Sequence, residues 1–413
     1  MTPEVKKRIE QIRQGIVPEG YKKGKIGIVP IKWNEVPFST LFTSTSEYTD
    51  DLKQYPLYSL TIEDGITAKT ERYERSHLVK KENSYKVVRP NDYAYNPMNI
   101  RFGAVARHKG DIPVAVSGYY DIFTTVHESD LVFMDSFLTY GPMITYYNKV
   151  STGSLVEKQR VHFSDFLEFS LALPPLEERK KIAEILSTQD KAIELQARKI
   201  EELKRFKKGC LEKMFPRKGQ KVPEKRFPGF TDDWEQRKLG DIGKARSGVG
   251  FPDAEQGGVT GIPFFKVSDM NLDGNENEMT VANNYVTAEQ IAVHRWSPIT
   301  ELPAIFFAKV GAAVMLNRKR LCRFPFLLDN NTMAYSLSST KWDADFAKAL
   351  FGTVDLTSLV QVGALPSYNA GDVESMEIYL PSLLEQEQIG GFFKQLDNLI
   401  TLHQRKYDKL TNV

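Results

Sequence analysis

The sequence contains very little cysteine: Cys210 and Cys322 are the only two in 413 residues. Two thiols cannot form a disulfide framework or a zinc site built from cysteines, and both are expected to be free, as in a reducing compartment. Histidine is also sparse, since the six histidines lie singly along the chain without the spacing of metal ligands. We therefore expect no metal site.

Long apolar runs and an excess of one charge are missing as well. No segment approaches the run of about 18 apolar residues that a membrane-spanning helix needs. The N-terminal stretch MTPEVKKRIEQIRQG is charged and amphipathic, unlike a signal peptide. Lys and Arg number 55 and Asp and Glu 53, so the formal net charge of +2 does not by itself predict a polyanionic partner. We expect a cytoplasmic protein that makes no membrane contact.

Familiar catalytic motifs are also missing. The sequence has no GxxxxGK[ST] loop for nucleotide phosphates. The glycine-rich SGVGFP (247–252) contains a proline and is not followed by a helical pattern, so we do not expect it to hold phosphate. NPMN (96–99) comes nearest to the [DN]PP[FY] motif of adenine methylation, but it lacks the second proline and the aromatic residue. We predict that the chain is not an enzyme in its own right and that it carries no catalytic residues.

What the sequence does contain is an internal repeat. Residues 173–204 align with residues 380–411 without a gap, at an offset of 207 residues, and 11 of the 32 positions are identical. Unrelated helices of ordinary composition would share about two or three. The chain is therefore two copies of one unit, in which a mixed domain is followed by a long helix.

The repeat continues outside these helices. At the same offset, VHFSDFLEFSLALP (161–174) aligns with YNAGDVESMEIYLP (368–381). Near the domain starts, WNEVPFSTLF from Trp33 resembles WEQRKLGDI from Trp234. Between such segments the halves differ in sequence and in length. The two copies thus share the long helix and the segments next to it, and they differ in the rest of each domain.

We predict an α+β fold: two mixed α/β domains, at 20–173 and 220–379, separated by two long antiparallel coiled-coil helices at 174–215 and 380–413, with pseudo-two-fold symmetry. QYPLYSLT in the first domain resembles GIPFFKVS in the second, around Pro56 and Pro263. Aromatic and β-branched runs broken by Gly, Pro and Asn indicate strands. These runs are Tyr55–Ile62, Asp92–Tyr95, Ile262–Val267 and Ala304–Phe307.

Both long helices carry apolar residues at heptad spacing, which is typical of helices that pack along each other. The first should begin just after Pro174–Pro175, because proline is tolerated in the first helical turn. Gln196 and His403 occupy the same point of the two seams, where a polar residue weakens the pairing but fixes its register. An alternative is that each stripe covers the core of its own domain. The predicted seam consists of Leu186, Gln189, Ile193, Gln196, Ile200, Leu203, Phe393, Leu396, Ile400, His403, Tyr407 and Leu410.

The second long helix departs from the first at Gly390–Gly391, which replace Ala183–Glu184. Each glycine in a helix interior costs roughly 1 kcal/mol relative to alanine. Close packing at this point, for example against a partner subunit, is one explanation.

An N-terminal helix at 1–19 is expected to complete the symmetric frame. EVKKRIEQI aligns with RFKKGCLEK in the first long helix, which matches Lys6 to Lys207. The C-terminal copy stops short of this stretch. We therefore expect the N-terminal helix to supply the missing end and to dock near residue 410.

Basic side chains cluster in both domains, with tyrosine or asparagine nearby. Arginine forks suit guanine edges and asparagine suits adenine edges, and loops bearing such residues are typical of surfaces that read nucleic acid. For any one residue, simple surface placement is the commoner outcome. The candidate DNA-binding residues are Lys69, Arg72, Arg75, Arg101, Arg107, Lys109, Tyr119, Lys266, Lys309, Arg318, Lys319, Arg320, Arg323 and Asn330.

Over essentially its full length the chain resembles the specificity subunit of type I restriction-modification systems. The resemblance rests on the tandem helix starts LPPLEERKKIAEIL and LPSLLEQEQIGGFF, on FKKGCLEKMFP (206–216), on RFPGFTDDWEQRKLGDI (226–242) and on IPFFKVSDMN (262–271). Two repeats at a fixed interval are more specific than any single motif.

This resemblance implies two target-recognition domains, each of which reads one half of a split, non-palindromic site in double-stranded DNA, while the paired helices set the spacer. It implies two modification subunits as partners, which would bring S-adenosylmethionine and the methylating site. Two motor-nuclease subunits would join them in the restriction enzyme. No cofactor is expected in this chain.

Two other functions stay open on the sequence alone. The chain could be a scaffold whose two domains bind proteins and have no role on DNA. It could also be an enzyme, such as a nuclease fused to helices, whose active site the motif search misses. Salt-dependent binding to a split DNA site separates the first alternative from the resemblance, and metal-dependent cleavage by the purified chain would support the second.

Overall fold

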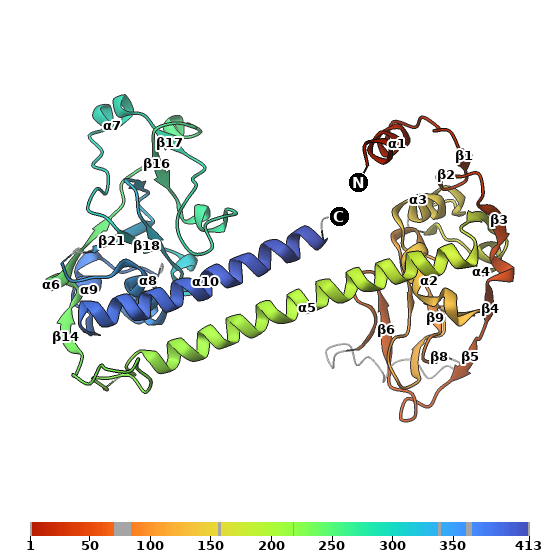
Figure 1. The fold of residues 1–413 in the computed structure, drawn as a ribbon, viewed down its shortest axis with the longest axis horizontal. Helices are drawn as coiled ribbons and strands as arrows, with labels where there is room; N and C mark the ends of the chain where they lie inside the picture. Colours follow the sequence, from red (N-terminus) through yellow and green to blue (C-terminus); the bar gives the residue numbers. More distant parts are fainter. Residues whose placement is uncertain are drawn as a thin grey trace. The chain divides into compact units, whose positions relative to one another are not determined.

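The structure is a computed structural model that describes residues 2–69, 84–155, 158–217, 219–337, 340–360 and 366–411. It divides into two compact units, residues 1–191 and 192–413, which we call unit 1 and unit 2. The division falls inside the long helix α5 (Leu176–Met214), drawn in yellow-green in Figure 1, so this helix belongs to both units. Each unit is described by itself.

Unit 1 is built on a four-stranded antiparallel sheet with the order β10-β9-β12-β4. Its core is aromatic: Phe38, Phe42, Phe123 and Phe166 are buried and pack ring against ring. The four strands are β4 (Phe42–Ser44), β9 (Tyr93–Tyr95), β10 (Val105–Arg107) and β12 (Asp121–Thr125). Smaller sheets pair β1 (Tyr21–Gly24) with β2 (Gly27–Pro30), β3 (Asn34–Pro37) with β13 (Ser170–Leu173), β6 (Tyr58–Thr61) with β7 (Gly65–Ala68), and β5 (Glu47–Thr49) with β8 (Tyr85–Val88) and β11 (Val114–Ser117). The helices are α1 (Pro3–Arg13), α2 (Leu131–Phe137), α3 (Gly141–Val150) and α4 (Phe163–Leu167).

Unit 2 repeats this plan with the sheet order β15-β21-β18-β19. Its core gathers Trp234, Trp342 and Phe346 together with Phe393 from the last helix. The four strands are β15 (Gly243–Ser247), β18 (Ala304–Ala308), β19 (Lys319–Cys322) and β21 (Thr332–Leu337). The smaller sheets pair β14 (Glu235–Lys238) with β22 (Glu377–Leu380), and β16 (Ile262–Phe265) with β17 (Tyr285–Val286) and β20 (Leu327–Leu328). The helices are α6 (Leu239–Ile242), α7 (Ala288–His294), α8 (Ala344–Thr353), α9 (Ala370–Glu374) and α10 (Leu383–Thr411).

The internal repeat predicted from the sequence is confirmed element by element. Helix α4, strand β13 and the start of α5 recur as α9, β22 and the start of α10, each displaced by 207 residues. Around the two matched prolines the pairing is also equivalent, because Leu57 pairs in parallel with Ala115 and Phe264 pairs in parallel with Leu327. The four predicted strand runs contain β6, β9 and β16 and all of β18 except Ala308.

The two long helices begin in the same way. Arg179 Nη1 donates to the carbonyl of Pro174 at 3.1 Å, and Gln386 Nε2 donates to the carbonyl of the equivalent Pro381 at 3.1 Å. Arg179 also forms a two-pronged ion pair with the buried Asp130 at 2.9 Å, which fixes the start of α5 on unit 1. Such bidentate pairs set direction as well as distance, so this pair fixes the direction in which α5 leaves the end of unit 1.

Within unit 2, residues 192–214 of α5 run antiparallel to α10 (Figure 1). Gln196 lies opposite His403, and ten residues later Phe206 lies opposite Phe392, with 6.4 Å between ring centroids. The partner number falls as the α5 number rises, which is the signature of an antiparallel pair. The fold is therefore the predicted one: mixed α/β units with two long antiparallel helices.

The glycines of α10 pack within the chain itself. A Cβ at Gly390 would lie 2.3 Å from Asp343 Oδ1 and 2.5 Å from the backbone nitrogen of Phe346, at the start of α8, whereas a Cβ at Gly391 would meet no atom within 4 Å. Close packing explains Gly390, and the neighbour is α8 of the same unit rather than a partner subunit.

Candidate nucleic-acid interface

The candidates in unit 1 are not equally available to a ligand. Lys69 is exposed just after β7, and Tyr119 is 46% exposed in the turn before β12. Arg72 and Arg75 lie outside the described residues. Arg101 stacks over Phe102, with 4.6 Å between the guanidinium carbon and the ring centroid, so one face of its fork is already covered.

Arg107 is held by a carboxylate of its own domain. Its Nε and Nη2 donate to the two oxygens of Asp135 at 2.9 and 2.8 Å, and Nη1 donates to Asn91 at 2.7 Å. This hydrogen bonding to Asp135 raises the pKa of Arg107 above the ordinary arginine value. Lys109 also lies 3.3 Å from Asp135, but its side chain remains 69% exposed. Lys109 is therefore the freer cation of the pair.

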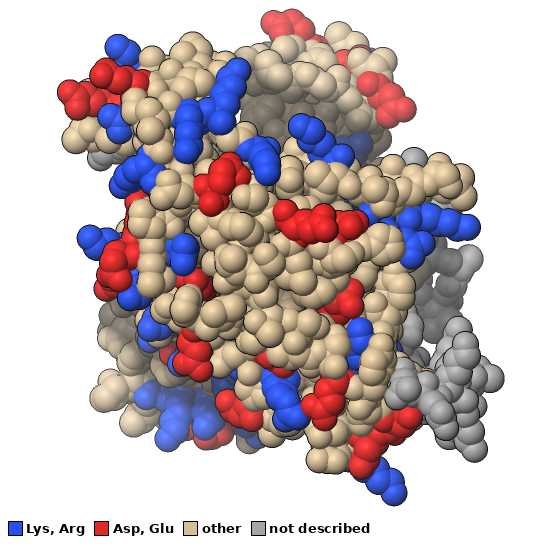
Figure 2. All heavy atoms as spheres, turned by 90° about the vertical axis from the view of Figure 1, so that its right-hand side faces the viewer, with Lys and Arg blue, Asp and Glu red and all other residues tan. Residues whose placement is uncertain are grey.

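Figure 2 shows one face of unit 1 with Lys and Arg interspersed among Asp and Glu, around a broad centre of other residues. Single-sign fields raise the local concentration of an oppositely charged ligand, whereas interspersed charges screen one another. This face is not a basic surface, so a DNA contact made through it would depend on particular side chains rather than on a general positive field.

In unit 2, Arg323 resembles Arg107 in its surroundings. Its Nε donates to Glu278 at 3.0 Å and its Nη2 contacts Asp345 at 2.5 Å, so its charge is neutralised within the domain. Lys266 is half-buried and donates to Gln256 at 3.1 Å. Lys309 is half-buried at the end of β18, and Asn330 is exposed in the turn before β21.

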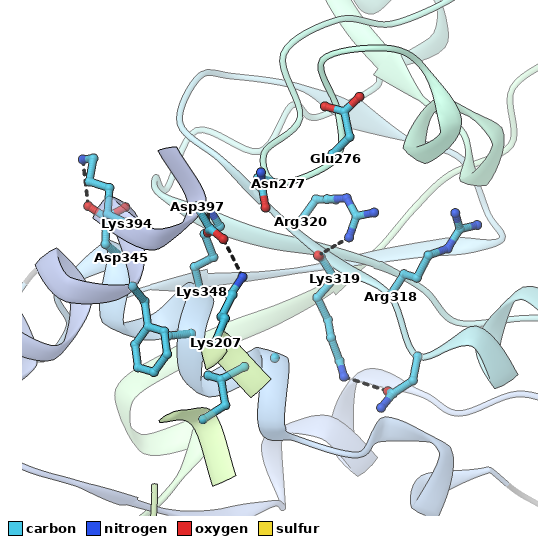
Figure 3. A pocket seen from close by; sticks show the side chains of 15 residues that line it. Lys207, Glu276, Asn277, Arg318, Lys319, Arg320, Asp345, Lys348, Lys394 and Asp397 are labelled. Atoms are coloured by element: carbon cyan, nitrogen blue, oxygen red, sulfur yellow. Dashed lines mark hydrogen bonds and ion pairs between the residues drawn. The ribbon is translucent and has the colours of Figure 1, made fainter. Parts of the chain in front are cut away.

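Arg318, Lys319 and Arg320 are brought together at one pocket of unit 2 (Figure 3). Arg318 Nη1 donates to Asn271 at 2.7 Å, and Arg320 Nε donates to the carbonyl of Asn275 at 2.6 Å. Burial lowers the pKa of Lys319 to about 8 and also lowers the pKa of Arg320. These three candidates line one cavity, and within the described residues none of them forms an ion pair.

Sequence reasoning missed the carboxylate beneath this pocket. Asp397 is 7% exposed and accepts from Lys207 at 2.5 Å and from Lys348 at 2.8 Å, so it joins α5, α8 and α10. The signal was present, because Asp397 is one of the positions identical between the two repeats, with Asp190 as its counterpart. Asp190 is exposed, so identity alone did not reveal which copy is buried.

The predicted seam residues are all buried or half-buried. The two polar members meet: His403 Nδ1 donates to Gln196 Oε1 at 2.7 Å. Ile200, Phe393 and Leu396 are the most buried members, at 4%, 2% and 6% exposure. Within unit 2, the apolar residues at heptad spacing on α5 and α10 thus lie on the sides of the two helices that face each other. The seam is also continuous with the core of unit 2.

A metal site, a membrane span and a reactive thiol each place requirements on the described residues. Among them, no group of three or more His, Cys, Asp or Glu side chains is placed to hold a metal ion. None of the helices in the described ranges is both long enough and apolar enough to cross a membrane. Both cysteines are free thiols, and burial raises the pKa of each, to about 12 for Cys322, which disfavours the reactive thiolate.

Comparison with known proteins agrees with this architecture. The family model described as the type I restriction modification DNA specificity domain matches residues 137–205 and 231–412. The chain is 25% identical, over 270 residues, to the type I restriction enzyme MjaVIII specificity subunit of Methanocaldococcus jannaschii, and the match spans 59% of each protein. It is 24% identical to the MjaX specificity subunit of the same organism over 428 aligned positions, which cover 98% of this chain and 89% of that protein. The fold is shared with the crystal structure of the type I restriction-modification S subunit from M. genitalium, with a TM-score of 0.56 at 14% sequence identity. The superposition covers 94% of this chain and 96% of that chain.

Proposed function

Because the chain belongs to the type I restriction-modification DNA specificity family, we propose that it is the subunit that chooses the DNA sequence on which a type I complex acts. Each unit reads one half of a split site in double-stranded DNA. The observation that carries this proposal is the repeated fold, in which one sheet order occurs twice while the segments around it differ. Two recognition domains with the same fold but different sequences would read two different half-sites, as a non-palindromic site requires.

The chain has no catalytic role in this proposal. Two modification subunits bind the frame and supply S-adenosylmethionine and the methylating site. Two motor-nuclease subunits join when the complex restricts DNA. The outward apolar side chains on the paired helices support a docking role, since Leu195 is 60% exposed on α5 and Leu399 and Leu402 are 43% and 49% exposed on α10.

The long helices set the length of the unread spacer. Helix α5 has 39 residues and therefore spans roughly 58 Å at about 1.5 Å per residue. An inserted turn of four residues adds about 6 Å, which is close to two base steps of about 3.4 Å. Placed between Ser187 and Thr188, the insertion leaves the part of α5 that packs on α10 in unit 2 unchanged.

The test is to sequence the methylated motif in cells that carry this insertion. We expect both half-sites to be retained and the spacer to lengthen by about one or two base pairs. A variant with the exposed Glu184, Thr188 and Lys191 replaced and no residue added is the control, and it should keep the original spacer. Altered half-sites with a constant spacer would contradict the proposal.

Exchange of one domain gives an independent test. Replacing residues 20–173 with the corresponding segment of a relative should change one half-site and leave the other half-site as it was. If both half-sites change, the units do not read separately. If the assembled complex shows no salt-dependent binding to a split DNA site, a protein-binding scaffold becomes the better explanation.

A further inference from the structure

A pocket of about 300 Å³ lies in unit 2 where the four-stranded sheet meets the long helices (Figure 3). Its walls come from α5, α8 and α10, from the start of β19, and from the segment around Glu276. All of these elements belong to unit 2. The pocket is thus a feature of one folded unit, built from five separate parts of the chain.

Two arginines enter this pocket without a counter-ion. In Figure 3 the side chains of Arg318 and Arg320 extend to the same side of β19, whereas Lys319 extends to the other side, as alternation along a strand requires. Among the described residues, none of the three lies within ion-pair distance of a carboxylate. The acceptors of the arginines are neutral: the amide oxygen of Asn271 for Arg318, and the carbonyls of Asn275 and Lys319 for Arg320.

None of the three carboxylates at the pocket forms an ion pair with the arginines, and two of them are held by other cations. Asp397 is neutralised by Lys207 and Lys348. Asp345 contacts Lys394 at 2.9 Å and also Arg323. Glu276 accepts from the backbone nitrogen of Gly274 at 3.0 Å. Glu276 acts on Arg320 only from beyond ion-pair distance. Because six Lys and Arg side chains line the pocket against three Asp and Glu side chains, the pocket keeps an excess of positive charge.

Arg318 also has unused hydrogen-bonding capacity. Its Nε is buried and has no partner. A buried donor without an acceptor is unfavourable, and guanidinium groups close together repel each other, so an anion that enters between Arg318 and Arg320 satisfies both. The planar fork of arginine matches phosphate oxygens in shape, with two parallel N–H donors.

We propose that this pocket binds a phosphate group, with Arg318 and Arg320 as its ligands. This assignment rests on the proposed function: the phosphate is a backbone phosphodiester of the bound DNA. Phosphate contacts position a protein on DNA without reading its sequence. Because Asp397 ties the floor of this pocket to both α5 and α10, the contact positions the DNA directly against the paired helices.

The experiment uses the complete complex with its modification subunits, and compares wild type with Arg318→Gln and Arg318→Lys. Affinity is measured over a range of salt for the duplex that carries the methylated motif and for an unrelated duplex. Lys244→Gln is the control, because Lys244 is exposed on β15, at the opposite edge of the same sheet. Thermal unfolding of the full chain in increasing inorganic phosphate tests the pocket in the absence of DNA.

We expect Arg318→Gln to weaken binding of both duplexes by about three- to tenfold and to reduce the salt slope by about one, with partial recovery in Arg318→Lys and an unchanged methylated motif. Inorganic phosphate should raise the unfolding temperature of wild type and of Lys244→Gln more than that of Arg318→Gln. Weakened binding of the motif duplex alone would overturn the proposal, since it indicates a base contact. Unchanged affinity together with an unchanged phosphate response would also overturn it, while leaving the proposed function intact. If the wild-type complex does not bind DNA, the proposed function fails. If inorganic phosphate then still stabilises wild type but not Arg318→Gln, the pocket binds phosphate from a source other than DNA. If inorganic phosphate has no such effect, both the proposed function and the phosphate site are overturned.

Discussion

Two adjacent glycines in α10 should respond to alanine in opposite directions. At Gly391 there is open space around the missing Cβ, so Gly391→Ala adds only helix propensity, worth about 0.8–1 kcal/mol in a helix interior. At Gly390 the Cβ would fall 2.3 Å from Asp343 Oδ1. That oxygen caps α8 by accepting the backbone N–H of Phe346 at 2.8 Å, so the methyl group must displace the cap.

The magnitude at Gly390 combines three effects. Overpacking a tight contact costs typically about 1–3 kcal/mol. Loss of an aspartate N-cap costs about 0.5–2 kcal/mol. The gain in helix propensity offsets about 1 kcal/mol of this. We therefore expect Gly390→Ala to destabilise unit 2 by about 0.5–4 kcal/mol.

Denaturant unfolding followed by tryptophan fluorescence suits this measurement, because Trp234 and Trp342 lie in the core of unit 2. For a domain of 150–250 residues, 1 kcal/mol corresponds to about 2–4 °C in melting temperature. Gly391→Ala should raise the denaturant concentration at the midpoint of unfolding, and Gly390→Ala should lower it. Two shifts of the same sign would refute the packing argument. Loss of modification-subunit binding in Gly391→Ala alone would instead assign that glycine to a partner surface.

Three further outcomes follow from the charged residues. Asp397→Asn should destabilise unit 2 by about 2–4 kcal/mol in denaturant unfolding, because it leaves two half-buried lysines without their carboxylate; a change below about 0.5 kcal/mol would show that the pair is solvated. If α1 completes the symmetric frame, Lys6 is placed relative to Asp190 as Lys207 is placed relative to Asp397. Cysteines at 6 and 190, in a chain without its native thiols, should then be joined by a short bifunctional thiol reagent, because the lysine side chain spans a distance too long for a disulfide. Absence of this cross-link would reject that docking. Burial lowers the pKa of Lys319 to about 8, below its unfolded value of about 10.4, so the folded state binds fewer protons between these values and stability rises with pH across them. The stabilising effect of Lys319→Met should accordingly be larger at pH 7 than at pH 10, and an advantage that is independent of pH would contradict the sign.

Much of the fold could be predicted because the repeat is visible in the sequence. The 207-residue offset predicts the recurrence of α4, β13 and the start of α5 as α9, β22 and the start of α10. Heptad spacing predicts the seam and places Gln196 and His403 at the same point of the two copies; their contact is a finding of the structure. These features are periodic and local, and each copy serves as a check on the other.

The candidate site was less predictable. Lists of basic residues could not separate Arg107 and Arg323, whose charges are neutralised inside their own domains, from Arg318 and Arg320, whose charges are not. Asp135 lies 28 residues from Arg107 along the chain, and no spacing rule connects them. Which cation retains an unpaired charge depends on which carboxylate the fold places beside it.

The sequence by itself determined the duplication, the two long helices and the absence of familiar catalytic motifs, because these follow from periodicity and from short-range spacing. Only the tertiary structure decided that Gly390 needs to be glycine while Gly391 does not, that Asp397 is buried while its repeat partner Asp190 is exposed, and that two arginines share a pocket without a counter-ion. The physical reason is that desolvation and close contact arise between segments far apart in the chain. Identical residues in a repeat can therefore have different energies once their neighbours differ.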